Sequence, residues 1–193
     1  MKNKIIYILI ILLTMTGCGA KTNENKEDTN NHYASLIDYQ EALKILKEDT
    51  TASVLDIKTG ITYEVKRVVG GFNTLADIET TSADETAKLL STIDNKWNII
   101  RRPVIVTIGD TKIAASISPF PHSGSEEKPY GDIIDNRSGS TGTGINLDSI
   151  RENNLIGVLD IYFYNSLTPG VNRVDERHQE MVLEAYNYDG KND

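Results

Sequence analysis

Residues 101–122 restrict the fold of this chain more than any other segment, because they form its densest run of β-branched residues outside the N-terminus. Apolar side chains alternate along residues 104–108, Gly109 and Asp110 supply a turn, and the alternation resumes along residues 113–117. A period of two is typical of strands with one buried face. The segment therefore predicts a β-hairpin with one strongly apolar face.

Two prolines follow this hairpin. Pro119 and Pro121 have a fixed φ, and each restricts the residue before it. We therefore expect residues 119–122 to form a stiff loop that presents Phe120 and His122 at a functional edge of the domain.

The N-terminus has the pattern of an export signal. Lys2 and Lys4 precede an apolar run over residues 5–13, which is too short to span a bilayer as a helix. The four residues that end at Cys18, Met-Thr-Gly-Cys, resemble a bacterial lipobox, in which the cysteine takes the lipid. We expect residues 1–17 to be a lipoprotein signal peptide and Cys18 to be acylated. An ordinary signal peptide followed by a chance cysteine is the alternative.

Charge and cysteine content restrict the partners of the exported chain. Cys18 is its only cysteine, so no intramolecular disulfide can form. Removal of residues 1–17 takes away two lysines and no acidic residue, which leaves 18 basic and 28 acidic side chains and a net charge of −10. Such a surface repels nucleic acid and anionic lipid. We expect no nucleic-acid partner, and attachment to the extracytoplasmic face of the cell membrane through the acyl chains of Cys18.

Residues 18–31 contain no apolar side chain after Ala20 and are rich in Asn, Lys, Glu and Thr. A segment of this composition cannot bury enough apolar surface to become ordered. We expect a flexible tether that spans on the order of 20 Å as a random coil.

Residues 32–193 are long enough for one domain with a sizeable core. Ser82 and Glu85 form a capping box at the start of one helical pattern. The other predicted elements follow from apolar periodicity. Together they are helices over residues 39–48, 83–93 and 175–186, strands on both sides of residues 58–60, the central hairpin, and a strand over residues 158–164. This order favours a single α+β domain with a mainly antiparallel sheet and flanking helices.

Residues 123–144 are rich in Gly, Ser, Pro and charged side chains and predict a long excursion rather than a regular element. Loops of this length in compact domains are usually functional or disordered. The glycine-rich run 138–144 resembles a phosphate cradle, but it follows no predicted strand and lacks a Gly-Lys-Ser/Thr ending, so loop flexibility explains it. Asn146 or Asp148 is a candidate start for a short helix that ends at Glu152.

The three histidines lack the spacing of a zinc site. We expect a solvated side chain for His32 and a surface or packing role for His178, whereas His122 on the stiff loop is a functional candidate. With Cys18 acylated no thiol remains for nucleophilic catalysis, and no GxSxG elbow is present. The residues therefore predict no catalytic group, no metal and no cofactor.

Asp77 and Glu79 lie two positions apart, so in an extended segment both carboxylates face the same way. Such a pair is suited to acid–base work or to binding a cation. A solvated edge, or ion pairs with Arg101 and Arg102, is the simpler interpretation.

Short segments of the chain carry a family resemblance, and these are residues 54–60, 76–79, 101–104, 114–116, 121–122, 136–139, 142–148, 172–175 and 178–179. They resemble, in the same order, a domain found in exported proteins of spore-forming Gram-positive bacteria, where it often follows peptidoglycan-binding repeats. The likeness covers about residues 53–185, nearly the whole domain. It implies a cell-wall or spore-envelope setting, and metal-dependent wall hydrolysis as one activity.

The chain departs from that family at four positions where the family pattern has histidine. These positions are Leu75, Val158, Tyr162 and Pro169. Tyrosine is a poor substitute for imidazole as a zinc ligand, and leucine, valine and proline offer no donor atom. The resemblance therefore implies that this domain has lost the histidine site of the family, while Asp77, Glu79, His122 and Asp160 are retained.

We therefore expect a catalytically inactive, lipid-anchored protein that binds peptidoglycan or a wall-processing protein. The candidate binding residues are Asp77, Glu79, His122, Asn136, Arg137 and Asp160, and all but Glu79 are expected to line the edge of one cleft. The alternative is a metal-dependent peptidoglycan hydrolase that uses His122 with a nearby carboxylate within hydrogen-bond reach. A solute-binding lipoprotein of a transporter is a third interpretation, although such proteins usually have two lobes.

Overall fold

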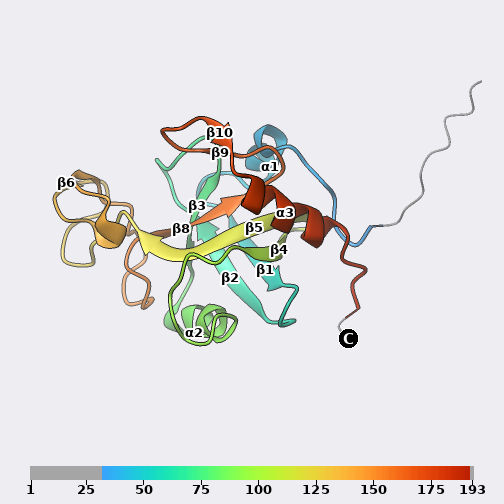
Figure 1. Ribbon diagram of the computed structural model, residues 1–193. Coiled ribbons are helices and arrows are strands. Elements are labelled where there is room, and N and C mark those ends of the chain that lie inside the picture. The colour runs from blue at the N-terminus through green and yellow to red at the C-terminus, as the bar shows by residue number, and fades with distance from the viewer. Residues whose placement is uncertain (1–31, 192–193) are drawn as a thin grey trace, which may run out of the picture. The chain divides into compact units, whose positions relative to one another are not determined.

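The computed structural model describes residues 32–191, in which six strands close into a barrel. Neighbouring strands pair antiparallel in the order β1-β2-β3-β8-β5-β4. Helices flank the barrel (Figure 1). The prediction of a single α+β domain with a mainly antiparallel sheet and flanking helices is therefore confirmed. The strands are β1 Thr51–Asp56, β2 Thr62–Arg67, β3 Ala76–Thr80, β4 Arg102–Ile108, β5 Thr111–His122 and β8 Val158–Tyr162.

Both predicted hairpins are present, as β4 with β5 and as β1 with β2. The Asp56 carboxylate stabilises the turn between β1 and β2, because it accepts hydrogen bonds from the backbone N–H groups of Lys58 (3.1 Å) and Thr59 (3.0 Å). The same carboxylate accepts a hydrogen bond from Nη2 of Arg102 (2.8 Å) at the start of β4. The turn and the neighbouring strand are thereby fixed to each other.

One face of every barrel strand belongs to the main hydrophobic core. The alternation of the strands places every second side chain on this face, as the sequence pattern requires. Burial of this surface is the main favourable contribution to folding in a domain without disulfides. The strand residues in the core are Ala52, Val54, Tyr63, Val65, Ala76, Ile78, Val104, Val106, Ile113, Ala115, Ile117, Leu159 and Ile161.

Three helices cover parts of the barrel, and they are α1 Tyr39–Ile45, α2 Ala83–Ser91 and α3 Glu176–Tyr186. The Ser82 hydroxyl accepts a hydrogen bond from the Glu85 backbone N–H (3.3 Å), which confirms the predicted start of α2. α3 lies across β4 and β5 (Figure 1), where Val182 packs in a second buried cluster with Ile105.

Two strands differ from our expectations. β5 continues through residues 119–122, where we expected a loop, because the φ of proline is compatible with a strand and its missing N–H is tolerated where the ladder with β8 shifts register between Ser118 and His122. β3 was not predicted as a strand, although Ala76 and Ile78 alternate with Asp77 and Glu79, because the run is only five residues long.

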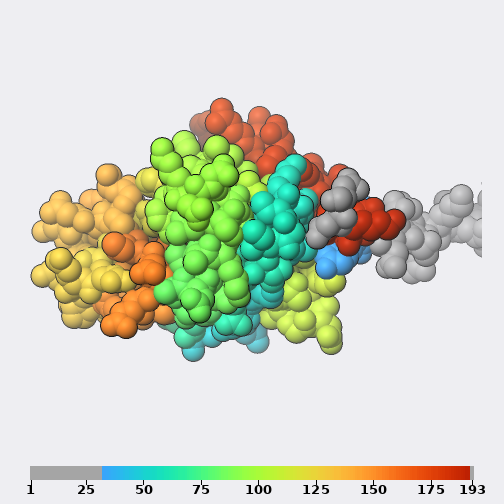
Figure 2. Space-filling view, turned by 90° about the horizontal axis from the view of Figure 1, so that it is seen from below, coloured from blue at the N-terminus to red at the C-terminus, as the bar shows by residue number. Residues whose placement is uncertain are grey.

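Residues 123–157 form an ordered excursion with short elements of its own. The strands β6 Ile133–Ile134 and β7 Gly144–Ile145 pair with each other, and η1 Ser138–Ser140 lies between them. Figures 1 and 2 show this excursion, coloured yellow to orange, at one end of the barrel. The helix expected from Asn146 or Asp148 is absent, because the Asn146 side chain bonds backbone groups of the loop instead. After β8, β9 Leu167–Thr168 and β10 Arg173–Val174 form a further small hairpin.

The predicted signal peptide, Cys18 and the tether up to residue 31 lie outside the described residues. Export and acylation therefore stay predictions. Between residues 32 and 191, none of the helices has both the length and the apolar character needed to cross a bilayer.

Candidate functional site

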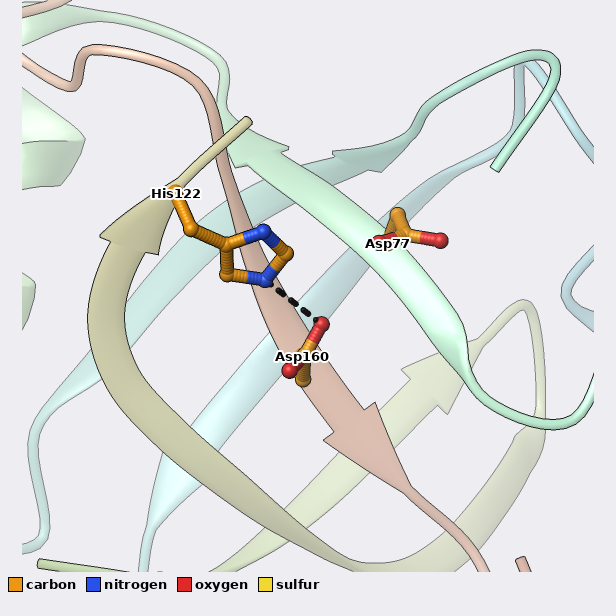
Figure 3. A group of neighbouring side chains, drawn as sticks. All are labelled: Asp77, His122 and Asp160. Carbon is orange, nitrogen blue, oxygen red and sulfur yellow. Dashed lines mark hydrogen bonds and ion pairs between the residues drawn. The ribbon is translucent and has the colours of Figure 1, made fainter. Parts of the chain in front are cut away.

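Three of the candidate binding residues converge on the outer side of the barrel. Asp77 lies on β3, Asp160 on β8 and His122 at the end of β5, and Figure 3 shows their side chains close together. One donor atom from each residue can be chosen such that all three atoms lie within 4.8 Å of one another. The fold therefore brings these three residues, which were chosen from the sequence, close together in space.

Strand pairing explains why these residues meet. Asp77 and Asp160 lie directly opposite each other in the β3–β8 pair. Leu159 and Ile161, on either side of Asp160, point into the core, so Asp160 points outward. The shift in register of β5 then places His122 opposite Val158, beside the same stretch of β8.

Both ring nitrogens of His122 have partners. Nε2 lies 2.9 Å from Oδ1 of Asp160, and Nδ1 lies 2.9 Å from the hydroxyl of Ser123. Burial would lower the pKa of His122, but the hydrogen bond with Asp160 and the charges of Asp160 and Asp77 outweigh it and raise the pKa above its usual value. The imidazole is therefore held in one orientation and stabilised as a cation.

Asp77 is almost completely buried, with 1% of its surface exposed. Its Oδ2 accepts a hydrogen bond from the Phe72 backbone N–H (2.6 Å), whereas its Oδ1 is buried without a hydrogen-bond partner among the described residues. Burial, and then the charge of Asp160, raise the pKa of Asp77 to about 7. A Cβ at position 71 would lie 2.3 Å from Oδ2, so Gly71 is what allows the backbone to approach this carboxylate.

A pocket of about 390 Å³ opens over His122 and Asp160. A second hollow of about 220 Å³ shares Phe72, Arg137 and Leu147 with it. The mixture of aromatic walls and a few polar groups is typical of ligand sites. The pocket is lined by Phe72, Phe120, His122, Ser123, Arg137, Gly139, Thr141, Leu147, Asp160, Tyr162, Thr168 and Pro169.

Arg137 lines the pocket, but its guanidinium forms hydrogen bonds within the loop. Its guanidinium donates hydrogen bonds to the carbonyl oxygens of Thr141 (2.9 Å), Gly142 (3.1 Å) and Ile145 (3.0 Å). Arg137 therefore fixes the excursion that forms one wall of the pocket. Asn136 and Asp77, both predicted to lie on the same cleft edge, are not among the lining residues.

Glu79 lies on the same strand as Asp77 but has a different role. Its carboxylate accepts hydrogen bonds from the backbone N–H and hydroxyl of Ser149 (2.8 and 2.5 Å) and from the backbone N–H of Ile150 (3.0 Å). Burial raises the pKa of Glu79 to about 7, although these hydrogen bonds oppose the shift. Glu79 anchors the end of the excursion and does not line the pocket.

The simpler interpretation of Asp77 and Glu79 is wrong, since neither is solvated. Arg101 forms an ion pair with Asp175 (2.7 Å) instead, and Arg102 with Asp56. The excursion covers Glu79 through Ser149 and Ile150, and the loop at Gly71 and Phe72 covers Asp77.

Of the four positions where the resembling family has histidine, two are buried and two line the pocket. Leu75 and Val158 are fully buried, and Val158 packs in a small apolar cluster. Tyr162 and Pro169 line the pocket.

The other two histidines lie outside the pocket. Tyr162 stacks on the buried His178, with ring centroids 3.6 Å apart, which confirms a packing role for that histidine. His32 is half-buried and stacks on Tyr186, so the expectation that it is solvated is wrong.

Several lining residues were missed by sequence reasoning. Phe72, Thr141, Leu147 and Thr168 come from loops or from short strands that have no apolar periodicity. The pair Gly70 and Gly71 before Phe72 was the available signal, since adjacent glycines often mark a close backbone approach.

The cluster combines the imidazole of His122 and the carboxylate of Asp160, which line a partly aromatic pocket, with the buried carboxylate of Asp77 beside them. It can bind a cation or an amine, or accept and donate protons. Comparison of the chain with protein-family models, with curated proteins and with solved structures finds no match.

Proposed function

We propose that this protein is a lipid-anchored, extracytoplasmic lipoprotein whose barrel domain binds a peptidoglycan fragment in the pocket over His122 and Asp160 without cutting it. The observation that carries this proposal is the pocket itself, in which Phe72 and Phe120 form aromatic walls and Asp160 lies at the base. The cell-wall setting rests on the lipobox and on the family resemblance.

The chemistry of the pocket suits a wall fragment. Faces of sugar rings pack on aromatic side chains, and Phe120 is 39% exposed and available for such contact. Free ammonium groups on peptidoglycan stem peptides complement the carboxylate of Asp160, which lines the pocket. The net negative charge of the domain makes a poly-anionic ligand unfavourable.

Binding of purified peptidoglycan and of soluble muropeptides by residues 32–193 tests this proposal. The hydrophobic core lies within these residues, so this part is expected to fold without the preceding segment. We expect Phe120→Ala to weaken muropeptide binding about tenfold, by loss of one aromatic contact. Ile133→Ala, at a 76% exposed position on β6 outside the pocket, is the matched control and should bind like the unchanged domain. Failure of the unchanged domain to bind, or equal binding by Phe120→Ala, overturns the proposal.

A peptidoglycan hydrolase is the second candidate, because His122 and Asp160 lie within the hydrogen-bond distance that a general base and its orienting carboxylate need. Mass spectrometry of muropeptides released from peptidoglycan distinguishes the two functions. Released fragments that disappear with His122→Ala establish the hydrolase and overturn binding without cleavage.

A further inference from the structure

We propose that Asp77, His122 and Asp160 form a binding site for a divalent transition-metal ion, with one imidazole nitrogen and two carboxylates as ligands and Zn²⁺ as the ion that fits best. This inference concerns an ion, not the wall fragment, and its test does not depend on that fragment.

The spacing of the donor atoms suits such an ion. Zn–N and Zn–O bonds of about 2.0–2.2 Å in a tetrahedral site separate the ligand atoms by roughly 3.4 Å. The three donor atoms lie within 4.8 Å of one another, and His122 Nε2 and Asp160 Oδ1 are 2.9 Å apart. Small side-chain rotations that open the closest pair and draw in Asp77 would therefore produce the coordination geometry.

Two features of Asp77 independently indicate a missing cation. Its Oδ1 is buried without a hydrogen-bond partner among the described residues, and a buried acceptor without a partner costs free energy. Asp160 lies directly opposite it across the β3–β8 pair, and like charges at such positions repel. A bound cation would give Oδ1 a partner and remove the repulsion between the two carboxylates.

In Asp77 and in His122, the side-chain atom that would not bind the metal already has a hydrogen-bond partner. The Phe72 backbone N–H holds Oδ2 of Asp77 and leaves Oδ1 free. Ser123 holds Nδ1 of His122, so a metal at Nε2 would leave the proton on Nδ1 to be donated to the Ser123 hydroxyl. Such outer hydrogen bonds orient ligands and increase metal affinity.

The arrangement leaves one side of the ion accessible. His122 and Asp160 line the pocket, whereas Asp77 lies beneath them and is nearly inaccessible. Three protein ligands with an open fourth position are typical of zinc sites that bind a further molecule. An imidazole ligand favours Zn²⁺ over Mg²⁺ and Ca²⁺, which prefer oxygen ligands alone.

Isothermal titration of residues 32–193 with ZnCl₂, together with elemental analysis after dialysis, tests the site. These residues exclude Cys18, which would otherwise bind zinc. We expect one Zn²⁺ per chain, and a loss of affinity of about 100-fold or more in His122→Ala and Asp160→Asn. His32→Ala and Asp110→Asn, which replace the same residue types away from the cluster, should bind zinc like the unchanged domain.

The variant Asp77→Asn tests whether Asp77 is a metal ligand or only a structural residue. Without metal this variant removes one buried like charge, so its melting temperature should equal or exceed that of the unchanged domain. Added zinc should raise the melting temperature of the unchanged domain and leave that of Asp77→Asn unaltered.

The site is refuted if the folded domain binds no zinc at micromolar concentrations, or if His122→Ala retains full affinity. Repeating the muropeptide assay with a chelator keeps this result separate from the proposed wall binding. Zinc binding without muropeptide binding supports the ion site alone, and the reverse result overturns the ion site alone.

Discussion

For Asp77 and Glu79, the sequence predicts the direction of the side chains but not their partners. Their common direction follows from their spacing and was predicted. Their different roles depend on partners far along the chain, since Asp77 meets Asp160 and Glu79 holds Ser149. Spacing identifies a pair of carboxylates, but only the paired strands and the covering excursion determine what each one contacts.

His178 is a buried titratable residue that the pocket does not use. It is 2% exposed, stacks on Tyr162, and lies with Nδ1 2.8 Å from the Ser116 hydroxyl. Burial, and then the charge of Arg101, lower its pKa to about 4. The folded domain therefore keeps this imidazole neutral, although the carboxylates of Asp175 and Asp160 oppose the shift.

The lowered pKa of His178 predicts a loss of stability in acid. The unfolded chain takes up this proton as the pH falls below about 6.5, while the folded domain resists it until about pH 4. Between pH 7.5 and pH 4 this residue should lower the free energy of unfolding by about 3 kcal/mol.

His178→Phe, which retains an aromatic ring beside Tyr162, isolates this contribution from other titrating groups. The difference in unfolding free energy between the unchanged domain and the variant, from urea titrations at both pH values, should fall by about 3 kcal/mol at pH 4. The His178 NMR signal, identified by its loss in His178→Phe, would contradict the assignment if it titrated in the folded domain with a pKa near 6.5.

At the level of elements, local patterns predicted most of the fold. The two hairpins, α2 with its Ser82 cap, and α3 were all found close to their expected positions. The strand β3 was missed because it is short, with only Ala76 and Ile78 as its core-facing apolar residues. Apolar alternation indicates a strand reliably only over a longer run, and it does not show that the polar side chains of the other face are buried.

The excursion was predicted only as a functional or disordered loop, and its order comes from buried polar side chains. The amide of Asn146 is fully buried. Its Oδ1 accepts hydrogen bonds from the backbone N–H groups of Ser125 (2.9 Å) and Asp148 (3.2 Å). Its Nδ2 donates to the carbonyl oxygens of Ser125, Lys128 and Pro129. One side chain thus replaces the pairing that a regular element would supply.

Asn146→Ala is expected to destabilise the excursion. The buried backbone N–H of Asp148 and four part-buried backbone groups lose their partner, at a cost of about 2 kcal/mol. Hydrogen exchange should become faster over residues 123–148, and the barrel strands should change little. The exposed Asn73, in the loop before β3, provides the matched control Asn73→Ala, which should not alter exchange in the excursion.

At the scale of the whole molecule, the closed barrel was not predicted. A strand pattern shows which face is buried but does not identify the neighbouring strand. β8 inserts between β3 and β5, so it joins segments that are far apart in the sequence. The convergence of Asp77, His122 and Asp160 follows from this insertion. They were chosen as candidates from the sequence, but their mutual distances follow only from the topology.

Membrane attachment through Cys18 is a prediction at the scale of the whole protein. Cys18→Ser should abolish incorporation of labelled fatty acid and release the protein from the membrane fraction, because the acyl chains of Cys18 are the expected attachment. Cell fractionation with immunodetection measures the release. Cys18→Ser that stays in the membrane fraction and still incorporates label would contradict acylation at this position.

The late position of β8 has a consequence for biogenesis. A chain exported from its N-terminus delivers β1 to β5 long before β8, yet β3 and β5 become neighbours only through β8. Contacts between such distant segments form slowly compared with local hairpins. If the chain is exported as predicted, the pocket over His122 and Asp160 therefore cannot form until β8 and Pro169 have crossed the membrane, when most of the chain has already emerged.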